Sequence, residues 1–291
     1  MYRCLLAPLR VFTLLILCTL MPACDRVDLA YRNLDIIIPW TLSDYLDMNA
    51  TQKAWFKERL ATHLRWHCST QLPLYLAWLD RAEQMVVDNE VSDQQLQART
   101  QEVKQAIAEV AEAVTPSAVD LLRGLDDEQV REMRQAFNED IRKRQEKYVR
   151  TPLDKQISGR AARMVKRLTP WIGELTPEQR VRVQAWSQSL GEQNRLWIDN
   201  RAHWQAQMSA ALDERQSPDF PRQVLRLLKD REGLWTPEYR QAYERTEKAA
   251  RSLLVDLMKT STPAQRQHLV DKLADVRQDF RQLKCLKYAG S

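Results

Sequence analysis

Apolar side chains recur three and four positions apart along most of the chain, and no run alternates apolar and polar residues between hairpin turns. The observed spacing places side chains on one face of a helix. A helix-start signal, in which Asn, Asp, Ser or Thr precedes Gln by three positions, recurs along the sequence. It occurs at Asn49–Gln52, Ser92–Gln95, Asp126–Gln129, Thr176–Gln179 and Thr262–Gln265, and Thr236 keeps the capping residue and the following Pro. The pattern predicts a chain built of helices.

The expected helices run between these start signals and single glycines. Gly124, Gly173 and Gly233 each precede a new start within a few residues, which is typical of glycines at helix ends. We expect helices at residues 27–46, 50–67, 71–87, 93–113, 116–124, 127–149, 152–170, 177–212, 219–231, 237–259 and 263–285. The segment 177–212 could break near Gly191.

The connections between these helices are short, which favours antiparallel packing of consecutive helices. No Ser-, Gly- or Pro-rich linker divides the chain. The expected fold is therefore all-α, an elongated multi-helix bundle of antiparallel helices joined by short loops. Residues 24–291 form a single helical domain in this interpretation, with two possible bundle lobes that meet near residues 115–125.

The first 24 residues indicate the compartment. Arg3 and Arg10 precede an uncharged run at residues 11–23, which is too short for a membrane span but suits the apolar core of a signal peptide. The run ends at Ala23-Cys24, and this junction resembles the lipobox of bacterial lipoproteins. We expect residues 1–23 to be a lipoprotein signal peptide and Cys24 to carry acyl chains, such as palmitate, that hold the protein to a membrane. An ordinary signal peptide or an uncleaved anchor is the alternative.

A lipoprotein of this kind faces the periplasm of a bacterial cell envelope, and the choice between inner and outer membrane stays open. Removal of residues 1–23 takes away Arg3 and Arg10 and no acidic residue, which lowers the net charge from +5 to +3. Two cysteines then remain besides Cys24, namely Cys68 and Cys285. In an oxidising compartment an even pair favours a disulfide, and two separate buried thiols are the alternative.

Composition argues against several classes of function. The 291 residues contain only 6 Gly, and neither a GxGxxG nor a GxxxxGK[ST] loop occurs, which disfavours Rossmann and P-loop enzymes. The 44 Lys and Arg are balanced by 39 Asp and Glu, a mixed surface that does not favour a nucleic-acid partner. No GxSxG motif occurs. We therefore expect neither an enzyme nor a cofactor.

One segment carries a family resemblance. It comprises Leu34-Asp35, Trp40, the run from Ser43 to Asp47, Gln52, Trp66-His67, Leu72-Pro73 and Tyr75. This pattern resembles the DUF6279 family of uncharacterised proteobacterial lipoproteins. The resemblance implies an envelope location and an all-helical body, and it carries no established activity. Separately, the phrase Leu175-Thr176-Pro177-Glu178-Gln179 resembles the L-T-x-x-Q motif of the Spy/CpxP periplasmic chaperones, although any capped helix start produces similar spacing.

Two sets of residues are candidates for chemistry. His63 and His67 lie four positions apart, as two metal ligands on one helix face would, with Cys68 or Asp44 as a third ligand. The alternative is that His67 forms a hydrogen bond inside the hairpin and His63 faces water. The second set is a polar cluster that could line a recess or simply fix packing. It comprises Trp40, Asp44, Tyr45, Trp66, His67 and Tyr75.

Three tryptophans, Trp186, Trp197 and Trp204, fall near one helical stripe if the helix runs unbroken through Gly191. They form either a core stripe or an apolar cradle. The expected function is a non-enzymatic, membrane-anchored helical scaffold or binding body with an envelope protein as a possible partner. The alternatives are a periplasmic chaperone or amphiphile-binding protein that uses the tryptophan face, and a metal-dependent envelope hydrolase that uses the two histidines.

Overall fold

The computed structural model describes residues 31–283, and within this range the chain forms helices and no strands. The helices are α3 (Leu34–Ser43), α4 (Ala50–Val87), α5 (Asp93–Arg123), α6 (Asp127–Tyr148), α7 (Leu153–Ile172), α8 (Pro177–Ser189), α9 (Gln193–Asp213), α10 (Phe220–Lys229), α11 (Pro237–Lys259) and α12 (Pro263–Arg281). The expected all-α class is confirmed. None of the helices in this range is long and apolar enough to cross a bilayer.

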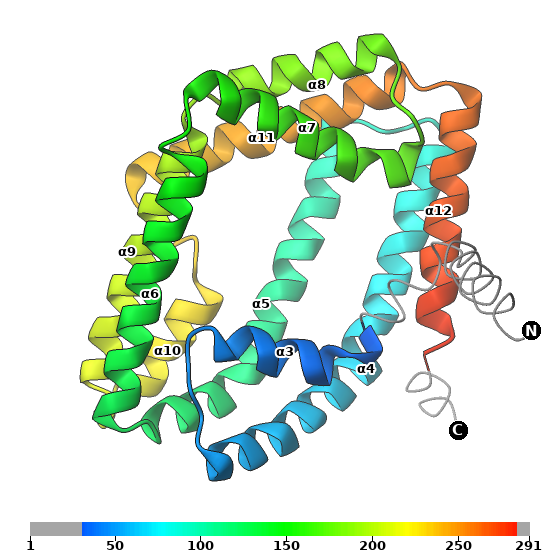
Figure 1. Cartoon of the computed structure of the whole chain (residues 1–291). Coiled ribbons are helices and arrows are strands. Elements are labelled where there is room, and N and C mark those ends of the chain that lie inside the picture. Colours follow the sequence, from blue (N-terminus) through cyan, green and yellow to red (C-terminus); the bar gives the residue numbers. More distant parts are fainter. Residues whose placement is uncertain (1–30, 284–291) are drawn as a thin grey trace, which may run out of the picture.

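The helices are arranged as a closed frame (Figure 1). Helix α6 packs on α9, α7 on α8, and α4 on α12, while α5 packs on α4, α10 and α11. Some consecutive helices therefore pack side by side as expected, such as α4 with α5 and α7 with α8. Others, such as α5 and α6 or α6 and α7, meet at corners of the frame (Figure 1).

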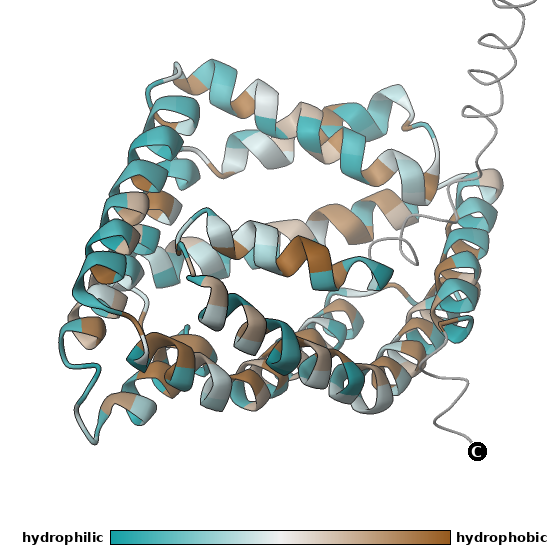
Figure 2. Ribbon diagram, turned by 60° about the horizontal axis from the view of Figure 1, so that its bottom comes forward, coloured by the Kyte–Doolittle hydropathy of each residue, from teal (hydrophilic) through white to brown (hydrophobic). Residues whose placement is uncertain are grey.

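Apolar side chains are buried in several clusters along this frame, and Figure 2 shows apolar positions distributed over every side. The largest cluster joins α5, α6, α9 and α10 and includes Phe137, Leu212 and Phe220. It draws on residues before, within and after 115–125, so that segment lies inside a shared core. A second cluster joins α7, α8 and α11, and a third joins α4 and α12.

Two predicted helix boundaries are wrong. Residues 50–87 form one helix through Pro73, and residues 93–123 form one helix through Pro116. A proline inside a helix removes one backbone hydrogen bond, but packing on both sides outweighs that cost here. Leu72 is almost fully buried before Pro73, and Thr115, buried before Pro116, donates its hydroxyl to the carbonyl of Ala111 at 2.6 Å.

Other boundaries follow the sequence more closely. The long segment 177–212 does break at Gly191, whose φ of +49° lies in the left-handed region that glycine favours. Helix α3 begins at Leu34 and ends at Ser43, inside the predicted span 27–46, of which residues 27–30 lie outside the described range. The last helix ends at Arg281, and the predicted end at residue 285 also lies outside that range.

Four of the predicted helix starts are complete capping boxes. At Asn49, Asp126, Thr176 and Thr262 the capping side chain accepts a hydrogen bond from the backbone N–H of the Gln three positions later, and the Gln side chain accepts one from the capping residue's own N–H. Ser92 and Thr236 cap in one direction only. The start signals therefore identified six helix N-termini correctly.

The same glutamines also join helices to one another in two crossed pairs. The side-chain amides of Gln52 and Gln129 donate to each other's oxygen at 3.0 and 2.8 Å. Each also donates to a backbone carbonyl two residues before the partner helix's cap, at 3.0 Å to Gly124 and 2.8 Å to Asp47. The N-termini of α4 and α6 are therefore fastened together.

Gln179 and Gln265 repeat this arrangement between α8 and α12. Their amides exchange hydrogen bonds at 3.0 Å in both directions, and they donate to the carbonyls of Thr260 and Glu174, which again lie two residues before the partner's cap. The two crossed pairs, here called the glutamine junctions, lie in the two halves of the sequence. Both glutamines of the second junction are buried, so each polar group has to find its partner inside the protein.

Candidate functional site

Helix α3 crosses the frame as a strap (Figure 1), and side-chain hydrogen bonds hold the chain to other helices near both of its ends. None of its residues is fully buried. Leu34, Ile38 and Leu42, spaced four apart, are half-buried, and Leu42 packs against the largest core cluster. Just beyond its C-terminal end, Leu46 and Met48 are buried in the same cluster. The chemistry-bearing residues that the sequence singles out lie around the two ends of this strap.

The first end of the strap is held by Tyr31 and His67. The Tyr31 hydroxyl lies 3.1 Å from His67 Nδ1, and the Tyr75 hydroxyl lies 3.2 Å from His67 Nε2. Both ring nitrogens are therefore occupied by phenol groups. Burial lowers the pKa of His67, which favours the neutral ring. Burial, followed by the neighbouring Tyr75, raises the pKa of Tyr31 to about 12. At neutral pH this is an uncharged hydrogen-bonded trio.

The second end of the strap is held by Tyr45 against α6 and α9. Its hydroxyl donates to Asp140 Oδ1 at 3.2 Å and accepts from Arg201 Nη2 at 3.1 Å, while its ring lies 5.8 Å from that of Phe137. Burial by itself would raise the pKa of Asp140, but hydrogen bonds from Arg144 and Arg201 outweigh it and lower the pKa to about 2. Asp140 is therefore a charged carboxylate that joins α6, α9 and the turn that follows α3.

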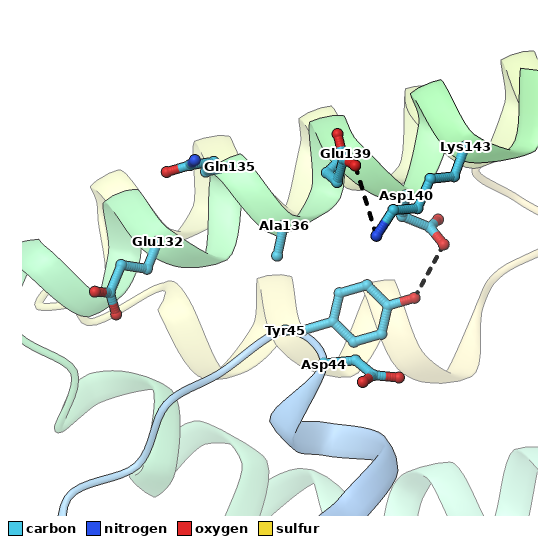
Figure 3. A pocket seen from close by; sticks show the side chains of 8 residues that line it. All are labelled: Asp44, Tyr45, Glu132, Gln135, Ala136, Glu139, Asp140 and Lys143. Carbon is cyan, nitrogen blue, oxygen red and sulfur yellow. Dashed lines mark hydrogen bonds and ion pairs between the residues drawn. The ribbon is translucent and has the colours of Figure 1, made fainter.

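A pocket of about 490 Å³ opens beside Tyr45 (Figure 3). Its lining consists of Asp44, Tyr45, Glu132, Gln135, Ala136, Glu139, Asp140 and Lys143. Small-molecule sites are mostly apolar concavities with a few polar groups, whereas this lining is charged or amide except for Tyr45 and Ala136. Glu139 is paired with Arg142 and Lys143, and Asp140 with Arg144 and Arg201. The pocket therefore belongs to the polar surroundings of the Tyr45 attachment.

The predicted single polar cluster is therefore two clusters. Trp66, His67 and Tyr75 gather at the first end of α3, where the ring of Trp66 lies edge-on to His67 at 6.4 Å. Asp44 and Tyr45 lie at the second end, with the length of α3, about 15 Å at 1.5 Å per residue, in between. Trp40 belongs to neither and is 70% exposed. The prediction grouped these residues because several of them are close in the sequence, but helix α3 separates the two clusters.

The two histidines do not converge on a shared ligand position. His63 Nε2 lies 2.8 Å from the Ser117 hydroxyl on α5, whereas His67 bonds the two tyrosines. Burial, followed by the positive charge of Arg59, lowers the pKa of His63. Among residues 31–283 no three His, Cys, Asp or Glu side chains lie close enough to hold a metal ion together. The alternative interpretation placed His63 against water, whereas in the structure its ring contacts the Ser117 hydroxyl.

The three tryptophans of the proposed stripe have different surroundings. Trp186 on α8 is 6% exposed within the second core cluster. On α9, Trp197 meets Tyr148 and Arg144, while Trp204 donates its indole N–H to the carbonyl of Leu227 at 2.9 Å. Because the helix breaks at Gly191, the stripe does not continue from Trp186 to the other two. They do not form one exposed apolar face.

Cys68 is 1% exposed and is disulfide-bonded. It is the only cysteine within residues 31–283, so its partner lies outside them. Leu283 packs in the same small cluster as Cys68 and Leu72 and stands two positions before Cys285. Pairing of Cys68 with Cys285 stays a prediction, as does acylation of Cys24. Cys24 and Cys285 both lie outside the described residues.

One comparison with known proteins gives a match. A family model described as a family of unknown function, DUF6279, matches residues 44–240. No curated protein and no solved structure matches the chain. The matched range includes Tyr45, the whole first glutamine junction and both histidines, and it ends in α11.

Proposed function

Because the chain belongs to the DUF6279 family, which has no assigned activity, we propose a function from the geometry of the strap and the frame. The protein is a non-enzymatic helical scaffold or binding body that faces the periplasm and is held to a membrane through acyl chains on Cys24. An envelope protein is its expected partner. The disulfide at Cys68 supports an oxidising compartment.

One observation carries the proposal. Three of the residues that the sequence marks as candidates for chemistry, Tyr45, His67 and Tyr75, hold the two ends of α3, the helix that follows the expected anchor. His67 has both ring nitrogens on tyrosine hydroxyls, and Asp140 receives two arginines and Tyr45. A general base or a metal ligand needs a ring nitrogen or carboxylate oxygen directed at a substrate or ion. Here these nitrogen and oxygen atoms bond to other side chains of the protein.

The frame suits such a role because polar links fasten its corners. The glutamine junctions join α4 to α6 and α8 to α12, and Arg160, buried on α7, donates to the carbonyls of Ser187 and Gly191 at 2.8 and 2.9 Å. Hydrogen-bonded polar groups inside a core specify one arrangement of the helices around them. A defined frame presents a constant surface to a partner.

The anchor is tested by mass spectrometry of the mature N-terminal peptide from the full chain produced in a bacterial envelope. The expected peptide begins at Cys24 and carries the mass of a diacylglyceryl group and an amide-linked acyl chain. As a matched control, Cys18→Ala leaves this mass unchanged because residue 18 lies in the segment that is removed. An unmodified Cys24, or a peptide that still contains residues 11–23, would refute the lipoprotein proposal.

The scaffold role is tested by quantitative affinity purification of the acylated full chain from native envelopes. If the protein is a binding body, the His63→Gln variant should still bind its partner saturably. Among the described residues, His63 forms a side-chain hydrogen bond only with Ser117. A hydrolase would instead lose its cellular activity in that variant while folding and partner binding stay intact. That result would contradict the non-enzymatic proposal.

A further inference from the structure

Helix α3 carries apolar side chains on its outer face as well as its inner face. Ile36, Ile37 and Trp40 are 63%, 40% and 70% exposed, and positions i, i+1 and i+4 share one side of a helix. These three residues are here called the α3 outer face. Figure 2 shows the apolar stretch of this helix in the middle of the frame. A helix that is apolar on both sides is normally covered on both sides.

The position of α3 in the chain indicates what covers that face. Tyr31 is fixed on His67, and it stands only seven positions after Cys24. Seven steps along a fully extended chain span at most about 25 Å. If Cys24 is acylated, the start of α3 is therefore held within this distance of the bilayer surface. The other exposed apolar side chains with comparable exposure, such as Val181 on α8, lie on helices that are remote in sequence from the anchor.

The side chains also fit a lipid interface in kind. Tryptophan is enriched where its ring meets the headgroup region, and isoleucine favours the acyl boundary. The residues beside the face, Asp35, Thr41 and Ser43, are polar and exposed, so they can stay in water when the apolar side chains enter the interface. The strap is also attached mainly at its ends, which leaves this face uncovered along its length.

We propose that the α3 outer face lies in the interface of the membrane that holds Cys24, so that the protein docks on the bilayer through Ile36, Ile37 and Trp40 in addition to its acyl chains. This inference rests on the proposed lipoprotein function. It also fixes which side of the frame faces the lipid, because α3 then lies against the bilayer.

The experiment places a photo-crosslinking residue, p-benzoylphenylalanine, at Ile36 in the acylated full chain. The matched control carries it at Val181, which is also β-branched and is 69% exposed. The proteins are reconstituted on vesicles of phosphatidylethanolamine and phosphatidylglycerol, floated through a density gradient, and irradiated. Because both positions are exposed, neither replacement should disturb the fold, and circular dichroism confirms that.

The expected result is a lipid adduct at residue 36 in at least tenfold greater yield than at residue 181. Equal yields at the two positions, an adduct to a second copy of the chain, or an adduct within the same chain would each overturn the proposal. Flotation separates this failure from failure of the anchor. A protein that floats but gives no lipid adduct at residue 36 is anchored without docking, whereas a protein that does not float refutes the anchor and, with it, the docking.

Discussion

The attachment of α3 depends on the charge of Asp140, and Asp140→Asn tests this directly. The fall in the pKa of Asp140 from 3.8 to about 2 corresponds to about 2 kcal/mol at about 1.4 kcal/mol per pH unit. Its side chain is 14% exposed and its two arginines are about 30% exposed. Solvent screening reduces the expected loss in unfolding free energy at pH 7 to between about 1 and 2 kcal/mol.

The pH dependence of this loss has a defined sign. Because the pKa in the folded state is lowered, the stabilisation is fully present above pH 3.8 and disappears as the pH falls through about 2. The difference between the wild-type protein and Asp140→Asn should therefore be constant from pH 7 to pH 5 and fall to about half near pH 3. Urea denaturation followed by circular dichroism at each pH measures it.

A neighbouring residue provides the control. Glu139 also has a lowered pKa of about 2, caused first by its hydrogen bond with Arg142, but this pair lies at the exposed surface of α6. Solvent and salt screen such a pair, so Glu139→Gln should leave the denaturation midpoint unchanged. If Asp140→Asn were as stable as the wild type at pH 7, or if its deficit persisted unchanged to pH 2, the assignment of Asp140 as the charged centre of the attachment would be refuted.

Three further predictions concern the frame. Gln265→Leu should lower the unfolding free energy by about 2 to 3 kcal/mol, because it removes both hydrogen bonds between the buried amides of Gln179 and Gln265. In the same urea titration Gln95→Ala, at a cap without a reciprocal box, should cost less than about 0.5 kcal/mol, and equal costs would refute the junction. Reduction of the Cys68 disulfide should destabilise the protein by about 3 to 5 kcal/mol. Non-reducing peptide mapping should recover Cys68 joined to Cys285, and a peptide that joins Cys68 to any other cysteine would contradict the pairing. Gly191→Ala should lower the melting temperature by a few degrees, since a side chain at φ +49° costs about 1 kcal/mol. Gly124→Ala should not lower it, because φ is negative there and the nearest atoms to an added Cβ lie 3.5 Å away. Similar melting temperatures for the two variants would show that the break between α8 and α9 tolerates a side chain.

Local signals in the sequence determined most of the secondary structure. The spacing of Asn49, Asp126, Thr176 and Thr262 from the glutamines that follow them was enough to locate four helix N-termini, because a capping box is formed by residues of one short segment. Gly191 allowed the break between α8 and α9 for a similarly local reason. The helix ends predicted before Pro73 and Pro116 were wrong. Proline is a strong local helix breaker, but its effect was outweighed by the tertiary packing of neighbouring residues such as Leu72 and Val119.

Only the tertiary structure decided what these local elements do together. The four capping glutamines could be assigned to helix starts from the sequence, but their crossed pairing spans 77 and 86 residues and depends on which N-termini meet in space. Tyr45 likewise forms its hydrogen bonds with residues far along the chain, Asp140 and Arg201. The partner of His67, Tyr31, is 36 positions away. The sequence by itself determined an all-helical chain with its caps and its expected anchor, because those depend on neighbouring residues. The frame, its junctions and the exposed face of α3 depend on contacts between distant residues, which no local pattern specifies.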